Sequence, residues 1–473
     1  MRIENRQFIN GEWLPSAGDQ FIEVIDPSTE EIVAKVCDGN EEDVASAVRS
    51  AKKAFPSYAK TTVKERIAYL KAIVSSYEKR KKDLVDTITL ELGSPKRISE
   101  RTHYQMGLEH FKEAIRQLES FSFIEKREAG IIQKEPIGVC ALITPWNFPM
   151  NQSVTKVASA LAAGCTLVLK PSEFTPLSAI ILAEIIEASG LPKGVFNLVN
   201  GRGESVGEAL TTHPDVDKIS FTGSGETGKT ISKKAADTIK KVSLELGGKS
   251  PFIVLDDFDL ETAAKIAVAN VMFNCGQVCT LASRTLIPQD RQEEFIKLAK
   301  EQLETYRVGN PHEASTRLGP LVSQAQYERV QYYIQKGMEE GATLVAGGLG
   351  KPAGLEKGYY VQPTIFSDVT NDMTIAQEEI FGPVMSILTY ETIDEAISIA
   401  NDTIYGLAAY ILGKDETTIR KIANELRVGR VIINGAQSDY SLPFGGYKQS
   451  GIGREWGDYG INEYLEVKSI IGL

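Results

Sequence analysis

The sequence predicts an α/β fold built on parallel sheets, and three features of the 473-residue chain indicate it. From Ile137 onward, short apolar runs rich in β-branched residues alternate with segments of helical pattern, which is typical of parallel strands joined by right-handed crossovers. A second series of the same kind begins near Lys249. The chain is also too long for one hydrophobic core, so two or three domains are expected.

The N-terminal region is expected to be helical between two β-elements. Asn-Gly at 10–11 separates two apolar runs and predicts a hairpin over residues 6–14. Asn40 is a candidate helix N-cap, because an apolar stripe at helical spacing follows it. Further helices are expected over 67–77 and within 82–118. Short aromatic and β-branched runs then predict a two-stranded ribbon over 121–134.

The regular series after Ile137 predicts five strands and four helices. The strands are expected at 139–143, 166–169, 195–199, 218–221 and 242–244, and the helices at 153–163, 177–188, 204–210 and 227–239. Ligands of parallel sheets bind beyond the carboxyl ends of the strands. The loops at 144–149, 170–173 and 222–225 are therefore candidate site loops.

The second α/β series is expected to start with a strand at 251–255 and a helix at 260–271, and to continue to about residue 447. Residues 336–350 and 354–359 are expected to be loop-rich. The tail from Asn462 alternates polar and apolar residues, which predicts a last strand that pairs with the ribbon at 121–134 or with another chain.

Composition excludes several classes of function. The net charge is −11, from 52 Lys and Arg against 63 Asp and Glu, which argues against nucleic acid or an anionic membrane as a partner. The N-terminus has no apolar signal core, and no apolar run is long enough to span a bilayer. Five cysteines without paired spacing indicate free thiols in a reducing, cytoplasmic compartment. The four histidines lie in no ligand-spaced pattern, so no metal site is expected.

Cys279 is the first candidate for chemistry. A buried structural thiol is the commoner role of a cysteine, and Cys275 and Cys279 also have the spacing of half a metal site, although no second pair exists. Gly-Gln at 276–277 leaves backbone N–H groups free near the Cys279 sulfur. Glu245 lies just past an apolar strand, before two glycines, where a pocket position is plausible. Asn147 is either an ordinary turn residue or an oxyanion donor.

The segment Gly223 to Thr230 matches the P-loop pattern, and an apolar strand that ends at Asp256 resembles the magnesium-binding strand of such proteins. A nucleoside triphosphatase is therefore a rival hypothesis. A binding protein without chemistry would leave the thiol and carboxylate unexplained. The serine-hydrolase elbow is not met, because Thr222 stands where its first glycine should be.

Over nearly its whole length the chain resembles the NAD(P)-dependent aldehyde dehydrogenases. The matching segments, in order, are residues 8–13, 144–149, 170–173, 221–224, 244–249, 273–279, 379–384 and 443–448. The resemblance implies that the glycine-rich turn serves the pyrophosphate of a dinucleotide at a helix N-terminus, so the P-loop match is coincidental.

The resemblance also implies a mechanism. Cys279 would attack an aldehyde as thiolate, with the oxyanion held by the Asn147 side chain and the Cys279 backbone N–H. Glu245 would activate the water that hydrolyses the thioester, and its presence favours a free acid rather than a coenzyme A product. The expected cofactor is NAD, with NADP possible, bound by Trp146, Lys170, Glu173, Gly223, Ser224, Glu379 and Phe381.

The aldehyde itself is not implied. The tunnel mouth is expected around Gln152, Phe273, Thr280 and Phe444, a mixture of polar and apolar side chains that supports no named substrate.

The family architecture implies a Rossmann-like NAD-binding domain from residues 1–117 and 137–247 and a catalytic α/β domain from 248–448. It also implies a small β oligomerisation element from 118–136 and 449–473, in a homodimer or homotetramer.

Overall fold

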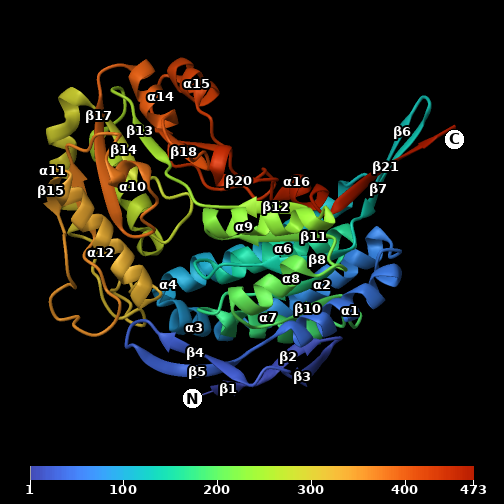
Figure 1. The fold of residues 1–473 in the computed structure, drawn as a ribbon. Helices are drawn as coiled ribbons and strands as arrows, with labels where there is room; N and C mark the ends of the chain where they lie inside the picture. Colours follow the sequence, from blue (N-terminus) through green and yellow to red (C-terminus); the bar gives the residue numbers. More distant parts are fainter. Residues whose placement is uncertain (1, 473) are drawn as a thin grey trace.

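Two largely parallel sheets, each in its own lobe, organise the protein (Figure 1). The computed structural model describes residues 2–472. The first sheet has the order β20-β12-β11-β8-β9-β10-β2-β3. Its parallel strands are β8 (Val139–Ile143), β9 (Thr166–Lys170), β10 (Phe196–Leu198), β11 (Lys218–Thr222) and β12 (Lys241–Glu245). The five predicted strands are thus confirmed, and the strand order reverses between β8 and β11.

Helices cover both faces of this sheet, which is why its strands are almost continuously apolar. Alternate side chains of β8 point to opposite faces: Val139 and Ala141 belong to one core, Cys140 and Leu142 to the other. One face packs against α1 (Glu41–Tyr58), α8 (Glu208–Thr212) and α9 (Gly225–Ala235). The other packs against α2 (Val63–Lys79), α3 (Lys81–Leu92), α5 (Gln105–Ser120), α6 (Pro149–Ala163) and α7 (Pro176–Ala188).

The N-terminal predictions are mostly confirmed. Asn10 and Gly11 have positive φ of 56° and 70° and join β2 (Arg6–Ile9) to β3 (Glu12–Pro15) in the predicted hairpin. The Asn40 side chain caps α1 by accepting from two backbone N–H groups. The structure adds a three-stranded sheet of β1 (Arg2–Glu4), β5 (Glu31–Asp38) and β4 (Gln20–Asp26), which the sequence analysis did not predict. Between α3 and α5 lie α4 (Lys96–Ile98) and a π-helical turn (Ser99–Tyr104).

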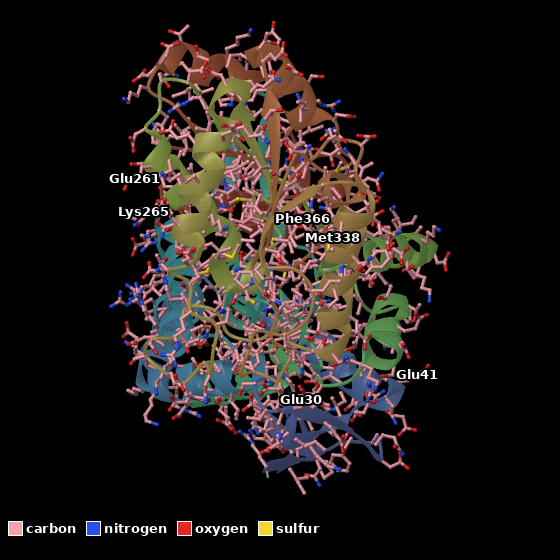
Figure 2. All side chains as sticks on the ribbon, turned by 90° about the vertical axis from the view of Figure 1, so that its left-hand side faces the viewer. Glu30, Glu41, Glu261, Lys265, Met338 and Phe366 are labelled. Carbon is pink, nitrogen blue, oxygen red and sulfur yellow. The ribbon has the colours of Figure 1, made fainter. Side chains whose placement is uncertain are left out.

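The second sheet has the order β15-β16-β17-β14-β13-β18-β19. Its strands are β13 (Pro251–Val254), β14 (Arg284–Pro288), β15 (Thr343–Ala346), β16 (Thr364–Ser367), β17 (Val384–Tyr390), β18 (Ala408–Leu412) and β19 (Arg430–Ile433). Its helices are α10 (Leu260–Met272), α11 (Gln292–Leu303), α12 (Gln324–Glu339), α13 (Thr374–Gln377), α14 (Ile393–Asn401) and α15 (Glu416–Glu425). In Figure 2, Glu261 and Lys265 mark the outer side of α10, whereas Phe366 of β16 is fully buried.

One loop prediction is wrong. Residues 336–350 contain the end of α12 and the antiparallel edge strand β15, whereas 354–359 contain no helix or strand. Gly337, near the start of the range expected to be loop-rich, lies inside α12. A Cβ at this position would lie 3.0 to 3.1 Å from Ile375 and Phe366, so the glycine allows the helix to approach the sheet closely.

The C-terminal strand pairs with the ribbon, as one of the two alternatives expected. β21 (Leu465–Ile471) runs antiparallel to β7 (Gly130–Pro136), which also pairs with β6 (Ile124–Arg127). This three-stranded sheet projects from the body of the protein at the right of Figure 1. β20 (Gly451–Ile452) and α16 (Gly457–Asn462) precede it. Among residues 2–472, no helix is long and apolar enough to cross a membrane.

Candidate active site

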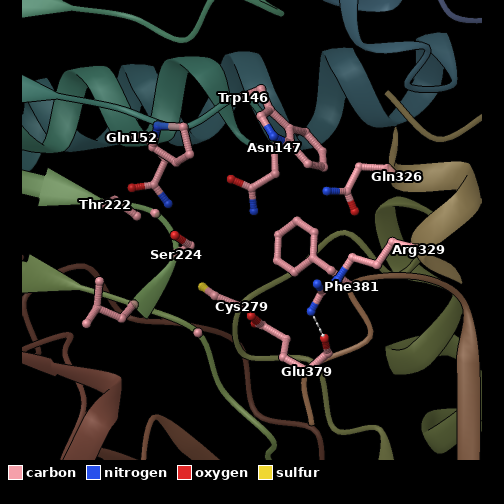
Figure 3. Close-up of a pocket in the computed structure, with 14 residues that line it drawn as sticks. Trp146, Asn147, Gln152, Thr222, Ser224, Cys279, Gln326, Arg329, Glu379 and Phe381 are labelled. Atoms are coloured by element: carbon pink, nitrogen blue, oxygen red, sulfur yellow. Dashed lines mark hydrogen bonds between the residues drawn. The ribbon is translucent and has the colours of Figure 1, made fainter. Parts of the chain in front are cut away.

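Cys279 lies where two cavities meet, and Gln152 is the other residue that contributes to both walls. We call them the loop cavity and the aromatic cavity. The loop cavity (Figure 3), of about 230 Å³, is lined by Pro145, Trp146, Asn147, Gln152, Thr222, Gly223, Ser224, Leu246, Gly247, Cys279, Gln326, Arg329, Glu379 and Phe381. The aromatic cavity, of about 200 Å³, is lined by Met106, Phe148, Asn151, Gln152, Asn270, Phe273, Val278, Cys279, Thr280, Leu281, Tyr410, Arg430, Ser438, Phe444 and Trp456.

A tight left-handed turn positions Cys279. Asn274, Cys275 and Gly276 have consecutive φ values of 49°, 55° and 70°, which is costly for the two non-glycine residues. A side chain at Gly276 would overlap the Gly382 carbonyl, so only glycine fits there. The Gln277 side chain fixes the turn, because it donates to the Asn274 carbonyl (3.2 Å) and accepts from the Val322 N–H (3.0 Å).

The two neighbouring cysteines differ in access. Cys275 is buried, and its thiol donates to the Gly319 carbonyl at 3.4 Å, whereas Cys279 is partly exposed and lines both cavities. Burial raises the pKa of both thiols to about 12, and the charges of Glu379 and Glu245 act on Cys279 in the same direction. Cys279 can therefore meet a ligand but needs help to lose its proton.

Asn147 lies in the loop after β8, at the edge of the same cavity. Its amide donates one hydrogen bond to the Gln277 carbonyl at 3.0 Å, and its backbone carbonyl accepts from the Asn274 amide at 3.0 Å. An asparagine amide has two N–H donors, so one remains for a ligand. Figure 3 shows this amide and the Cys279 sulfur on the walls of one cavity, an arrangement that can stabilise an oxyanion next to the thiol.

Glu245 ends β12 and is 3% exposed, with one carboxyl oxygen that has no hydrogen-bond partner. Burial and the charge of Glu455 raise its pKa well above the usual range, against the opposing charges of Lys156 and Arg454. Glu455 itself forms a buried ion pair with Lys156. Glu245 does not line either cavity, although its charge acts on Cys279. A buried carboxyl group with a free oxygen and a raised pKa is a candidate general base.

A third cavity, the sheet-end cavity, continues from the loop cavity across the carboxyl ends of β8, β9 and β11. Its volume is about 670 Å³, and Trp146 and Gly223 are among the residues that line both cavities. Lys170 at the end of β9 is buried, and its amine donates to the Pro171 carbonyl (2.9 Å) and lies 3.5 Å from the Glu173 carboxylate. Burial lowers the pKa of Lys170, and Glu173 opposes this shift.

The glycine-rich turn leads from β11 into α9 at the edge of this cavity. Gly223 lines the cavity, and the Ser224 hydroxyl caps α9 by accepting from the Thr227 N–H at 3.2 Å. Lys229 is exposed and does not line the cavity, and Asp256 follows β13 in the other sheet. A P-loop needs both groups at the phosphates, so the structure does not support the nucleoside triphosphatase alternative.

Glu379 and Phe381 approach the loop cavity from the second lobe. The Glu379 carboxylate accepts from the Gly248 N–H at 3.1 Å, and burial raises its pKa to about 7. The Arg329 guanidinium donates to the Glu379 backbone carbonyl, the bond drawn in Figure 3. Phe381 has a φ of 63° and packs edge-on against Trp146, with ring centroids 5.4 Å apart. The two aromatic rings therefore form one wall of the cavity.

The aromatic cavity contains all four side chains expected at the tunnel mouth: Gln152, Phe273, Thr280 and Phe444. Further residues line this cavity that were not predicted from the sequence, namely Met106, Asn270, Leu281, Tyr410, Arg430 and Trp456. Asn270 and Leu281 lie beside the predicted Phe273 and Thr280, whereas the other four come from elements far from the Cys279 segment, where no local pattern marks them. Gln326 and Arg329 of the loop cavity were missed for the same reason.

Comparisons with known proteins agree with this architecture. The model of the aldehyde dehydrogenase family matches residues 13–470. A protein of Staphylococcus haemolyticus assigned to the same family is 56% identical over 472 residues, which cover 100% of this chain and 99% of that one. A mutant of aldehyde dehydrogenase C of Pseudomonas syringae, in complex with NAD+ and octanal, superposes with a TM-score of 0.98 at 44% identity, covering 99% of this chain and 96% of that one. The Mycobacterium tuberculosis aldehyde dehydrogenase with NAD+ has a TM-score of 0.97 at 40% identity, over 100% and 99% of the two chains.

Proposed function

The chain belongs to the aldehyde dehydrogenase family, and we propose that it oxidises an aldehyde to the carboxylic acid with NAD+ at Cys279. The observation that carries the assignment is the position of this thiol. Cys279 is the partly exposed cysteine of the chain, and it stands between the loop cavity, which opens toward the sheet ends, and the aromatic cavity. A nucleophile at such a junction can meet a substrate from one side and a cofactor from the other.

The residues of the sheet-end cavity suit a dinucleotide. The cavity lies where the strand order reverses, which is the usual nucleotide site of such sheets, and it contains the start of α9 and the buried amine of Lys170. Lys170 and Glu173 would bind the adenosine ribose, and Gly223 and Ser224 the pyrophosphate. Trp146, Glu379 and Phe381 would bind the nicotinamide end. When bound there, NAD+ supplies the acceptor for the hydride that leaves the substrate carbon.

The first step is attack by the Cys279 sulfur on the aldehyde carbon, which requires prior loss of the thiol proton. The carbonyl oxygen then carries negative charge. The second N–H of the Asn147 amide and the Cys279 backbone N–H would donate to it. Since the Asn147 amide is already oriented by its bond to the Gln277 carbonyl, little reorganisation is needed when this charge develops.

Oxidation leaves an acyl group on the Cys279 sulfur as a thioester. Glu245 would take a proton from water as the water oxygen attacks the acyl carbon, and cleavage of the C–S bond would return the thiolate. The free oxygen of Glu245 supports this role, and its pKa, raised by burial and by the charge of Glu455, makes the carboxylate a stronger acceptor for the proton of water. The product is then the free acid.

Activity is tested with a panel of short aliphatic, aromatic and hydroxylated aldehydes, each with NAD+, by the absorbance of NADH. We expect turnover with at least one aldehyde and stoichiometric formation of its acid. Absence of NADH formation across the panel, in a folded protein that binds NAD+, would contradict the assignment.

We further propose the division into an NAD-binding domain (1–117 and 137–247), a catalytic domain (248–448) and an oligomerisation element (118–136 and 449–473) in a cytoplasmic homodimer or homotetramer. The projecting sheet of β6, β7 and β21 supports the last of these, because Ile124, Val467 and Ile471 are exposed on it. By the strand register, Val467 and Ile471 lie on one face of this sheet and Ile124 on the other. Exposed apolar side chains on a projecting sheet are available for contact with another copy of the chain. Light scattering of the purified protein distinguishes monomer, dimer and tetramer.

A further inference from the structure

The aromatic cavity contains one permanently charged side chain among its described lining residues, that of Arg430 at the start of β19. Its guanidinium carbon lies 4.9 Å from the ring centroid of Trp456 and 5.4 Å from that of Phe444. The guanidinium donates a single hydrogen bond, to the Ser438 hydroxyl at 3.3 Å. No carboxylate within residues 2–472 forms an ion pair with it.

This environment leaves the charge of Arg430 only partly compensated. A guanidinium that loses water is normally paired with a carboxylate, and burial lowers the pKa of Arg430 in the absence of such a partner. The faces of Trp456 and Phe444 stabilise the cation but use none of its in-plane N–H groups. A guanidinium has five donors in a planar fork that matches a carboxylate. The remaining donors are thus available to an anion inside the cavity.

We propose that Arg430 binds a carboxylate on the substrate, so that the preferred aldehydes are short semialdehydes with the carbonyl group at Cys279 and the carboxylate at Arg430. Both residues line the same cavity, whose volume of about 200 Å³ restricts the substrate to a small molecule. A single arginine without a second lining cation matches a monoanion better than a phosphate dianion. The proposal rests on the proposed function, since it names the substrate class of that site.

The alternative is a structural role, in which Arg430 only holds the stacked rings of Phe444 and Trp456, 4.8 Å apart. The two roles predict different kinetics. A structural arginine affects all aldehydes to the same extent, whereas a carboxylate receptor affects only charged substrates. The informative quantity is therefore the ratio of kcat/KM for 4-oxobutanoate to kcat/KM for butanal, which has the same number of carbons.

In the wild type we expect this ratio to exceed one. Arg430→Met should lower it by at least about tenfold, mainly through a higher KM for 4-oxobutanoate, because a charged hydrogen-bonded pair is lost. Arg430→Lys, which keeps the charge without the fork, should give an intermediate ratio. The matched control is Arg427→Met, which removes an exposed arginine from the same segment outside the cavity and should leave the ratio unchanged.

A measurement on the wild type covers the case in which Arg430→Met does not fold. Butanedioate should inhibit butanal oxidation competitively, whereas neutral butanediol should not. A wild-type ratio of one or less, an equal loss for both aldehydes in Arg430→Met, or no inhibition by butanedioate would overturn the carboxylate proposal while butanal oxidation still supports the dehydrogenase assignment. Failure to oxidise any aldehyde of either kind would overturn both.

Discussion

The loop and sheet-end cavities on one side of Cys279 differ from the aromatic cavity on its other side in the parts of the chain that form them. The sheet-end cavity and the adjoining wall of the loop cavity are formed largely by segments that follow directly after strands: the ends of β8, β9 and β11, the glycine-rich turn and the start of α9. The opposite wall of the loop cavity comes from the second lobe and includes Glu379 and Phe381. The aromatic cavity combines the segment 273–281 around Cys279 with side chains from α5, α6, α10, β18, β19 and the segment before α16. A site made from strand ends is marked by short local motifs, whereas a site made from scattered side chains exists only after folding. Cys279 lines both the loop cavity and the aromatic cavity, whereas most other residues line only one of them. Variants of single residues can therefore test the function of each cavity separately.

The largest effect is expected from Cys279→Ala, which removes the residue shared by the two sides. Oxidation should fall at least about a thousandfold, because the nucleophile is lost, while NAD+ affinity measured by fluorescence titration should change little. Cys275→Ala is the matched control: this thiol is buried and bonded to the Gly319 carbonyl, so activity should remain near that of the wild type. An active Cys279→Ala together with an inactive Cys275→Ala would mean that the other sulfur is the nucleophile.

Glu245→Gln should act on thioester hydrolysis and leave both cavities intact, since Glu245 lines neither of them. The amide keeps the shape but cannot accept the proton of water. We expect a burst of NADH followed by a steady rate about a hundredfold or more below that of the wild type. Mass spectrometry should detect the acyl group on Cys279. An equal loss of burst and steady phases, without trapped acyl enzyme, would exclude Glu245 as the base.

The reactivity of Cys279 should depend steeply on pH in the absence of cofactor. Burial raises the pKa of the thiol to about 12, so the thiolate fraction is small near neutrality and should grow about tenfold for each pH unit. Alkylation by iodoacetamide should accelerate accordingly as the pH rises, with the modified residue identified by peptide mapping. A rate that levels off near neutral pH would mean that a nearby group already deprotonates the thiol.

Glu173→Gln tests the proposed cofactor site in the sheet-end cavity without changing the aromatic cavity. A carboxylate at the ribose accepts hydrogen bonds from hydroxyl groups and repels a 2′-phosphate, so the wild type should prefer NAD+. The variant should shift the kcat/KM ratio of NADP+ to NAD+ upward by up to about tenfold, since Glu173 is partly exposed and its charge is screened. Glu187→Gln, at the far end of α7, controls for the loss of one charge. A wild type that favours NADP+ would overturn this role for Glu173.

The smallest effect is expected from Lys229→Ala. This lysine is exposed on α9 and does not line the sheet-end cavity, so aldehyde oxidation should stay within about twofold to threefold of the wild type. Magnesium-dependent ATP hydrolysis by the wild type, measured as phosphate release, should be absent. If the wild type hydrolyses ATP and Lys229→Ala does not, the glycine-rich turn from Gly223 to Thr230 acts as a P-loop.

Elements with a local cause could be predicted from the order of the amino acids alone. Asn10 and Gly11 specify the hairpin because both adopt positive φ, and Asn40 starts α1 because its side chain caps the first turn. Apolar runs between helical segments predicted the parallel strands, since both faces of such strands are buried. The same locality explains why the loops after β8, β9 and β11 could be named as site loops in advance.

Features that depend on distant partners became visible only in the folded chain. Residues 336–350 were expected to be loop-rich, but α12 extends through Gly337 to Glu339, with Gly337 close to Phe366 and Ile375. The buried pair of Lys156 and Glu455 lies 299 residues apart in sequence, and Arg430 meets Trp456 only because β19 and the segment before α16 line one cavity. Desolvation and charge depend on what surrounds a side chain in space, and the sequence order does not contain that information.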